Sequence, residues 1–102
     1  MANVRNSNSY YIDTQSSVDA DNIAVKGLAV AYVALTATAA NGRLVLQDLT
    51  ATPTTKIDLR VEVSGHTEVF SFEMFPILFP NGIKPSVLSN AVATLVFKEN
   101  NR

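Results

Sequence analysis

An alternation of apolar and charged side chains in residues 56–63, KIDLRVEV, constrains the fold of this chain more than any other feature. Apolar residues occupy every second position, and charged residues stand between them. A period of two places the two sets on opposite faces of a β-strand, whereas an amphipathic helix needs a period of about 3.6. The segment is predicted to be a half-buried strand whose core-facing residues are Ile57, Leu59, Val61 and Val63.

A second alternating segment, EVFSFEMF at residues 68–75, follows the short stretch SGHT. Phe70, Phe72 and Met74 form its larger apolar set and are predicted to fill the core. Two strands joined by a few residues that include a glycine typically pair as a hairpin. We therefore predict that these two segments form a β-hairpin.

Further strands are predicted on both sides of this pair. Residues 28–40 fit either a helix face or a strand; the strand is favoured because Val, Tyr and Thr recur at alternate positions and because Asn41-Gly42, typical of a hairpin turn, follows. Residues 43–49 form the next predicted strand. Residues 90–97 are apolar on both faces, which is typical of a central strand or of one covered by a neighbouring subunit.

Together with SYYID near the start and IAVK at residues 23–26, these segments amount to about seven to eight short strands, and no segment predicts a helix. This pattern is typical of an all-β fold, an antiparallel β-sandwich of jelly-roll type. The 102 residues suffice for one domain. We expect a single sandwich domain over residues 9–102, preceded by a polar N-terminal arm over residues 1–8.

The composition indicates which partners to expect. Charged residues make up 17% of the chain, below the roughly 25% usual for soluble domains. Such a surface suits either the centre of a protein interface or a monomer covered by uncharged polar groups. Because the net charge is −1 and the basic residues are scattered along the sequence, nucleic acid is not an expected partner. The N-terminus lacks the apolar core of a signal peptide and no stretch is long enough for a membrane helix, so a soluble protein without membrane contact is expected.

No motif for catalysis, metal binding or nucleotide binding is present. His66 is the only histidine, so neither a catalytic triad with a buried base nor a multi-histidine metal site is expected. Asp19 and Asp21 lack the glycine and the bidentate glutamate of a calcium loop. Glu68 and Glu73 are predicted on opposite faces of a strand. We expect no enzymatic activity, no catalytic residue, no cofactor, no metal and no small-molecule substrate.

The segment FPILFP at residues 75–80 leaves two interpretations open. Pro76 and Pro80 are expected to end the strand ladder, because proline has no N–H group to donate. Phe75, Ile77 and Phe79 then either pack under the end of the sandwich or form an exposed contact patch.

Three features together resemble the small all-β virion proteins of tailed bacteriophages, such as capsid cement or decoration proteins and related head and tail accessory proteins. They are the NGRLVLQD hairpin entry, the alternating strands KIDLRVEV and VFSFEMF, and the ending FPILFPNGIKPSVLSNAVATLVF. The resemblance covers about residues 23–98. It implies a non-enzymatic structural protein on the capsid surface of a virion assembled in the host cytoplasm. The implied partners are the major capsid protein and the protein itself, as a homotrimer.

The predicted contact residues follow from this resemblance and from the apolar segments. Residues 1–14 are expected to reach across a subunit or capsid boundary by strand pairing, or else to form the first strand and cap the core. The alternative function is a tail-associated adhesion module or a carbohydrate- or receptor-binding module. The predicted subunit or capsid contacts are Tyr10, Tyr11, Ile12, Phe75, Ile77 and Phe79.

Overall fold

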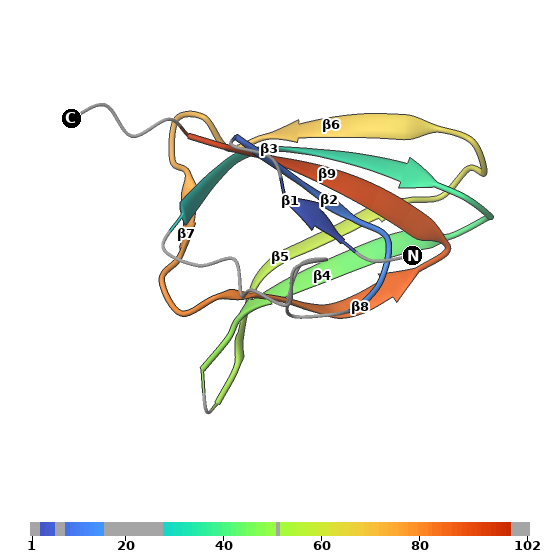
Figure 1. Ribbon diagram of the computed structural model, residues 1–102. Helices are drawn as coiled ribbons and strands as arrows, with labels where there is room; N and C mark the ends of the chain where they lie inside the picture. Colours follow the sequence, from blue (N-terminus) through green and yellow to red (C-terminus); the bar gives the residue numbers. More distant parts are fainter. Residues whose placement is uncertain (1–2, 6–7, 16–27, 51, 99–102) are drawn as a thin grey trace.

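A computed structural model describes residues 3–5, 8–15, 28–50 and 52–98. In these residues the chain forms nine strands in two antiparallel sheets that pack face to face (Figure 1). The predicted all-β sandwich is confirmed, while the jelly-roll connectivity stays a prediction. No helix long and apolar enough to cross a membrane occurs in the described part of the chain. The predicted strand at residues 23–26 lies outside the described residues, as do Asp19 and Asp21.

The larger sheet has six strands, and the last of them in sequence, β9, lies near its centre. Strand β9 is hydrogen bonded to β2 on one side and to β3 on the other, which confirms the prediction of a central position for residues 90–97. The short strand β7 extends the sheet by pairing with the beginning of β3. The strands are, in order, β1 (Val4–Arg5), β2 (Ser9–Ile12), β9 (Ala91–Phe97), β3 (Leu28–Ala37) and β6 (Thr67–Ser71), with β7 (Ile77–Phe79) also on β3.

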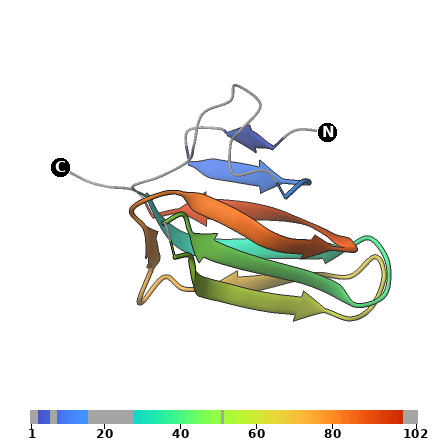
Figure 2. The same cartoon turned by 90° about the horizontal axis from the view of Figure 1, so that it is seen from below.

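The smaller sheet has three strands in the order β5 (Thr54–Val61), β4 (Gly42–Asp48) and β8 (Ile83–Ser89). Both pairings shift register near Leu46, where each outer strand carries one extra residue. Figure 2, seen from below, shows this sheet lying over the larger one.

The core lies between the two sheets and is built from the inward set of each strand. Leu35 and Leu95 project from the larger sheet, and Leu44 and Leu46 project from the smaller one; all four are fully buried. Burying a side chain of this size contributes about 1.5–3 kcal/mol to stability. Phe70 and Phe72 are partly buried against this core, as predicted.

Two predicted hairpins are wrong, because the strands concerned lie in different sheets. β5 pairs with β4, and β6 pairs with β3, so the SGHT stretch carries the chain from one sheet to the other. The same is true of Asn41-Gly42, which joins β3 to β4. Asn41 does adopt the positive φ that its sequence suggested, at 63°. Alternation tells which face of a strand is buried, but it does not identify the neighbouring strand.

Two predicted core positions are also wrong because their strands end earlier than the alternation does. Val63 lies beyond the end of β5 and is 66% exposed. Met74 lies beyond the end of β6 and is 86% exposed. Pro76 and Pro80 do not simply end the ladder, since β7 lies between them and returns the chain to β3.

The beginning of the chain is tied to the sandwich by Asn3. Its Oδ1 atom accepts hydrogen bonds from the backbone N–H groups of Asp13 and Thr14, at 2.9 and 3.0 Å, and its Nδ2 atom donates to the Tyr10 hydroxyl at 3.4 Å. The side chain is fully buried. Residues 3–5 of the predicted polar arm therefore belong to the domain, and Val4–Arg5 forms its first strand.

Candidate protein-interaction surface

Three of the six predicted contact residues are core residues of the chain itself. Tyr10 and Ile12 point inward from β2, and Phe79 points inward from β7; all three are fully buried. With these strands in place, their side chains do not reach a partner, and their prediction as contacts is corrected. Of the two interpretations given for Phe79, an exposed contact or packing under the end of the sandwich, its full burial supports the packing.

The other three predicted residues lie nearer the surface. Tyr11 is half-buried on the outer face of β2, because its neighbours on the strand point inward. Ile77 is half-buried against the core. Phe75 is 81% exposed in the connection between β6 and β7, next to the exposed Met74. We call Met74 and Phe75 the apolar loop.

The outer face of the six-stranded sheet carries no charged side chain in its described strands, and we call it the uncharged face. One row crosses the sheet through the paired residues Val4, Tyr11, Thr94, Ala34 and Val69. A solvent-facing sheet surface normally alternates to polar or charged side chains. The outward residues of this face are Val4, Ser9, Tyr11, Ala29, Tyr32, Ala34, Thr36, Thr67, Val69, Ser71, Leu78, Val92, Thr94 and Val96.

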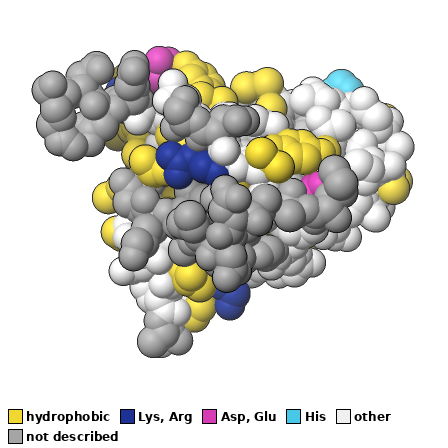
Figure 3. All heavy atoms as spheres, in the orientation of Figure 1, with side chains coloured by type: hydrophobic (Ala, Val, Ile, Leu, Met, Phe, Trp, Pro, Cys, Tyr) yellow, Lys and Arg dark blue, Asp and Glu magenta, His cyan; other side chains and the backbone are white. Residues whose placement is uncertain are grey.

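Tyr32, on the uncharged face, is hydrogen bonded to the carboxylate of Glu73, which directly precedes the apolar loop. A hydrogen bond with Glu73 raises the pKa of the Tyr32 hydroxyl, and burial and the negative charge of Glu73 raise it further. In Figure 3 hydrophobic side chains reach the surface over the β6–β7 connection, at the upper left, beside an acidic group. The apolar loop and this contact therefore lie in one surface region.

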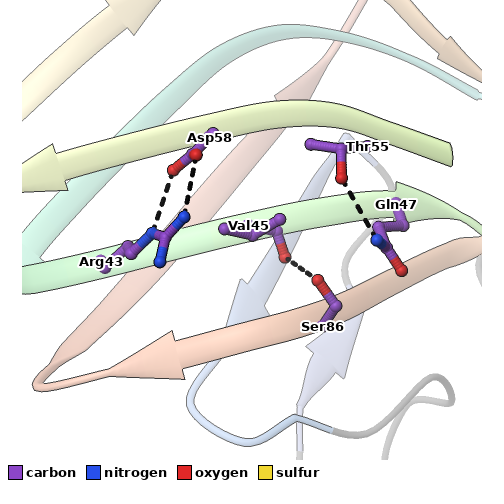
Figure 4. Close-up of polar contacts among 6 residues, drawn as sticks. All are labelled: Arg43, Val45, Gln47, Thr55, Asp58 and Ser86. Atoms are coloured by element: carbon purple, nitrogen blue, oxygen red, sulfur yellow. Dashed lines mark hydrogen bonds and ion pairs between the residues drawn. The ribbon is translucent and has the colours of Figure 1, made fainter.

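The outer face of the three-stranded sheet has the opposite character. Arg43 on β4 bonds Asp58 on β5 through two nitrogens, Nε to Oδ1 at 3.2 Å and Nη2 to Oδ2 at 3.0 Å (Figure 4). These hydrogen bonds lower the pKa of Asp58 and raise that of Arg43. Gln47 donates to the Thr55 hydroxyl on the same face.

The described residues that bear catalytic groups are dispersed. His66 is exposed, with Nε2 3.9 Å from Oε1 of Glu68. Glu73 lies beyond the end of β6, so Glu68 and Glu73 do not share a regular strand. Within the described ranges no group of three or more His, Asp or Glu side chains is arranged to hold a metal ion.

A pocket of about 210 Å³ opens at one end of the smaller sheet. Its described lining is formed by Asn41, Gly42, Arg43, Arg60 and Glu62.

Sequence reasoning missed the uncharged face as a unit. The signal was present, because the outward sets of residues 28–37 and 91–97 contain no charge. Only the register shows that these sets are neighbours, since β3 and β9 are far apart in the sequence and pair directly.

Comparison of the chain with protein-family models, with curated proteins and with solved structures finds no match.

Proposed function

We propose that this chain is a non-enzymatic structural protein of a virion. In this proposal it is a decoration protein that binds the outer surface of a phage capsid and stabilises the contacts between capsomers. Its partners would be the major capsid protein and further copies of itself, as a homotrimer. The resemblance of residues 23–98 to small virion proteins supplies the capsid as the partner, and the uncharged face supplies a surface for it.

The uncharged face is the observation that carries the proposal. Val69 is 66% exposed, and Leu78 is 51% exposed. Interface centres are depleted in charge and enriched in aromatic residues, and Tyr11 and Tyr32 provide aromatic rings here. Phe75 adds an exposed aromatic ring in the apolar loop. A face of this kind suits a protein partner better than it suits bulk water.

A carbohydrate- or receptor-binding module is the second candidate. The observation in its favour is the pocket lined by Asn41 and Glu62, which offers an amide and a carboxylate to a polar ligand. Sugar sites usually add an aromatic platform, and none of the described lining residues is aromatic. The uncharged face therefore supports the structural role more strongly.

The test of the structural role measures how the protein binds purified particles. Val69→Lys places a charge on the uncharged face, and Val63→Lys is a matched control because Val63 is equally exposed but lies outside that face. We expect Val69→Lys to weaken binding to particles at least about tenfold, because a buried unpaired charge costs more than about 1.4 kcal/mol. Val63→Lys should bind like the original chain.

Quantitative mass spectrometry of the particles gives the second readout. A fixed ratio of this chain to the major shell protein supports capsid decoration. A few copies per particle favour a tail module, and absence from particles contradicts the proposal. Equal binding by both lysine variants would show that the uncharged face is not the contact.

A further inference from the structure

Four basic residues that are scattered along the sequence gather on the outer face of the three-stranded sheet. Arg43 on β4 lies directly opposite Arg60 on β5, and Gln47 on β4 lies opposite Lys84 on β8. Lys56 is the extra residue where β5 shifts register beside β4. We call Arg43, Lys56, Arg60 and Lys84 the cationic face.

The cations on this face outnumber its carboxylates. The four residues are half of the eight Lys and Arg residues in the chain. Within the described strands, Asp58 on β5 is the carboxylate that lies on this face. Asp58 is already bonded to Arg43 through both of its oxygens. Glu62, which follows β5, adds a second carboxylate and lines the pocket. The whole chain has a net charge of −1, so positive charge is concentrated on one side of the sandwich.

The pair Arg43 and Arg60 is the centre of the cationic face. Like charges directly opposite each other on neighbouring strands destabilise a sheet, and Asp58 offsets only part of this repulsion. Arg60 is exposed, and Arg43 and Arg60 line the pocket of about 210 Å³ together with Asn41 and Glu62. A carboxylate entering this pocket would meet Arg60 and the Asn41 amide, which are good donors to anionic oxygens, beside Arg43, which already bonds Asp58. The Glu62 carboxylate in the same lining opposes it.

We propose that the cationic face is a second docking surface, which binds an acidic surface of a partner protein by receiving carboxylates at Arg43 and Arg60. Apolar side chains lie between the cations, since Val45 pairs with both Asp58 and Val87 on this face. Separated cations can bind the carboxylates of a protein surface, and the apolar residues between them can contact its apolar side chains. Nucleic acid is favoured less, because phosphate binding uses dense basic clusters, whereas the cations on this face are separated.

This inference goes beyond the proposed function and does not depend on it. The cationic face and the uncharged face are the outer faces of the two sheets, and they lie on opposite sides of the sandwich (Figures 1 and 2). A protein with these two surfaces can contact two different protein partners at once.

The test uses a short Glu-Ser repeat peptide as the acidic probe and the matching Gln-Ser peptide as the neutral one. Binding is measured by isothermal titration calorimetry at low and at high salt. We expect saturable binding of the Glu-Ser peptide that weakens with salt. Arg60→Gln should weaken it by about two- to fivefold, the usual value of an exposed ion pair. Arg60 is chosen because its removal leaves the Arg43–Asp58 ion pair intact.

Lys98→Gln is the matched control, because Lys98 is an exposed cation just beyond β9 in the other sheet. It should leave peptide affinity unchanged. The proposal is overturned if the Glu-Ser peptide does not bind or if the Gln-Ser peptide binds as well. An equal loss in Lys98→Gln, or tighter binding of a single-stranded DNA oligonucleotide, also overturns it. Val69→Lys should bind the peptide normally, so failure of this inference is distinguishable from failure of the capsid proposal.

Discussion

Asn3 shows how one polar side chain determines where the beginning of the chain lies. Its amide oxygen accepts from the backbone N–H groups of Asp13 and Thr14, which lie beyond the end of β2. It also accepts from the Thr14 hydroxyl at 3.1 Å. Buried backbone donors need such partners, because an unpaired donor in the interior costs free energy. In the sequence, Asn3 is one of several asparagines in a polar stretch, and nothing local marks it as buried.

We expect Asn3→Ala to lower the free energy of unfolding by about 1–3 kcal/mol, because two partly buried backbone donors lose their acceptor. Denaturant-induced unfolding followed by circular dichroism measures the change. Asn8→Ala, at an exposed position in the same part of the chain, should change the free energy by less than about 0.5 kcal/mol. Equal stability of Asn3→Ala and the original chain would mean that the N-terminal residues are not anchored by this side chain.

The element scale is dominated by the connections at one end of the sandwich. The links β3–β4, β5–β6 and β8–β9 all cross between the sheets there, at the right of Figure 1. Backbone hydrogen bonds join them, with Asn41 N–H donating to Glu62 C=O at 2.9 Å and Thr38 N–H donating to Asn90 C=O at 2.8 Å. Asn90 also has a positive φ, at 53°. These contacts bring residues from three connections into one tight region.

Gly42 is the residue on which this close approach depends. A Cβ atom at this position would lie 2.9 Å from the Asn90 carbonyl oxygen and 3.0 Å from the Ala37 Cβ. We expect Gly42→Ala to cost about 1–3 kcal/mol, because backbone atoms must shift to relieve the overlap. Thermal and denaturant unfolding measure this loss.

Gly65 provides the comparison for Gly42. It has a φ of 81° and open space around an added Cβ, and asparagine tolerates this backbone conformation. Gly65→Asn should therefore remain close to the stability of the original chain. A Gly42→Ala variant as stable as Gly65→Asn would show that the sheet-crossing end is not tightly packed.

At the scale of the whole molecule, the two sheets share a single core. Tyr10 and Leu95 from the larger sheet and Leu44 and Leu46 from the smaller one belong to the same cluster of buried side chains. Neither sheet has another apolar layer to cover its inner face in the described residues. The sandwich is therefore expected to fold and unfold as one cooperative unit.

This cooperativity predicts that Leu46→Ala and Leu95→Ala each lower the one unfolding midpoint of the whole domain. Each should cost about 2–5 kcal/mol, the usual range for removing a fully buried leucine side chain. Far-UV and near-UV circular dichroism should give coincident transitions. Val96→Ala, on the outer face beside Leu95, should cost less than about 1 kcal/mol. Two separate transitions in either leucine variant would show that the sheets are independent.

The sequence by itself determined the all-β class, most strand positions and the buried face of those strands. Leu35 and Leu95 occupy the inward positions that alternation predicts, because the period of side chains along a strand is a local property. Strand ends were less well predicted, as Val63 and Met74 show, because a strand ends where its partner ends.

Only the tertiary structure decided which strands are neighbours. It separated β5 from β6, placed β7 on β3, and turned Tyr10, Ile12 and Phe79 from predicted contacts into core residues. It also assembled the uncharged face and the cationic face from residues distant in sequence. Pairing and packing depend on the whole chain competing for the same partners, and this competition is not encoded in the period of any one segment.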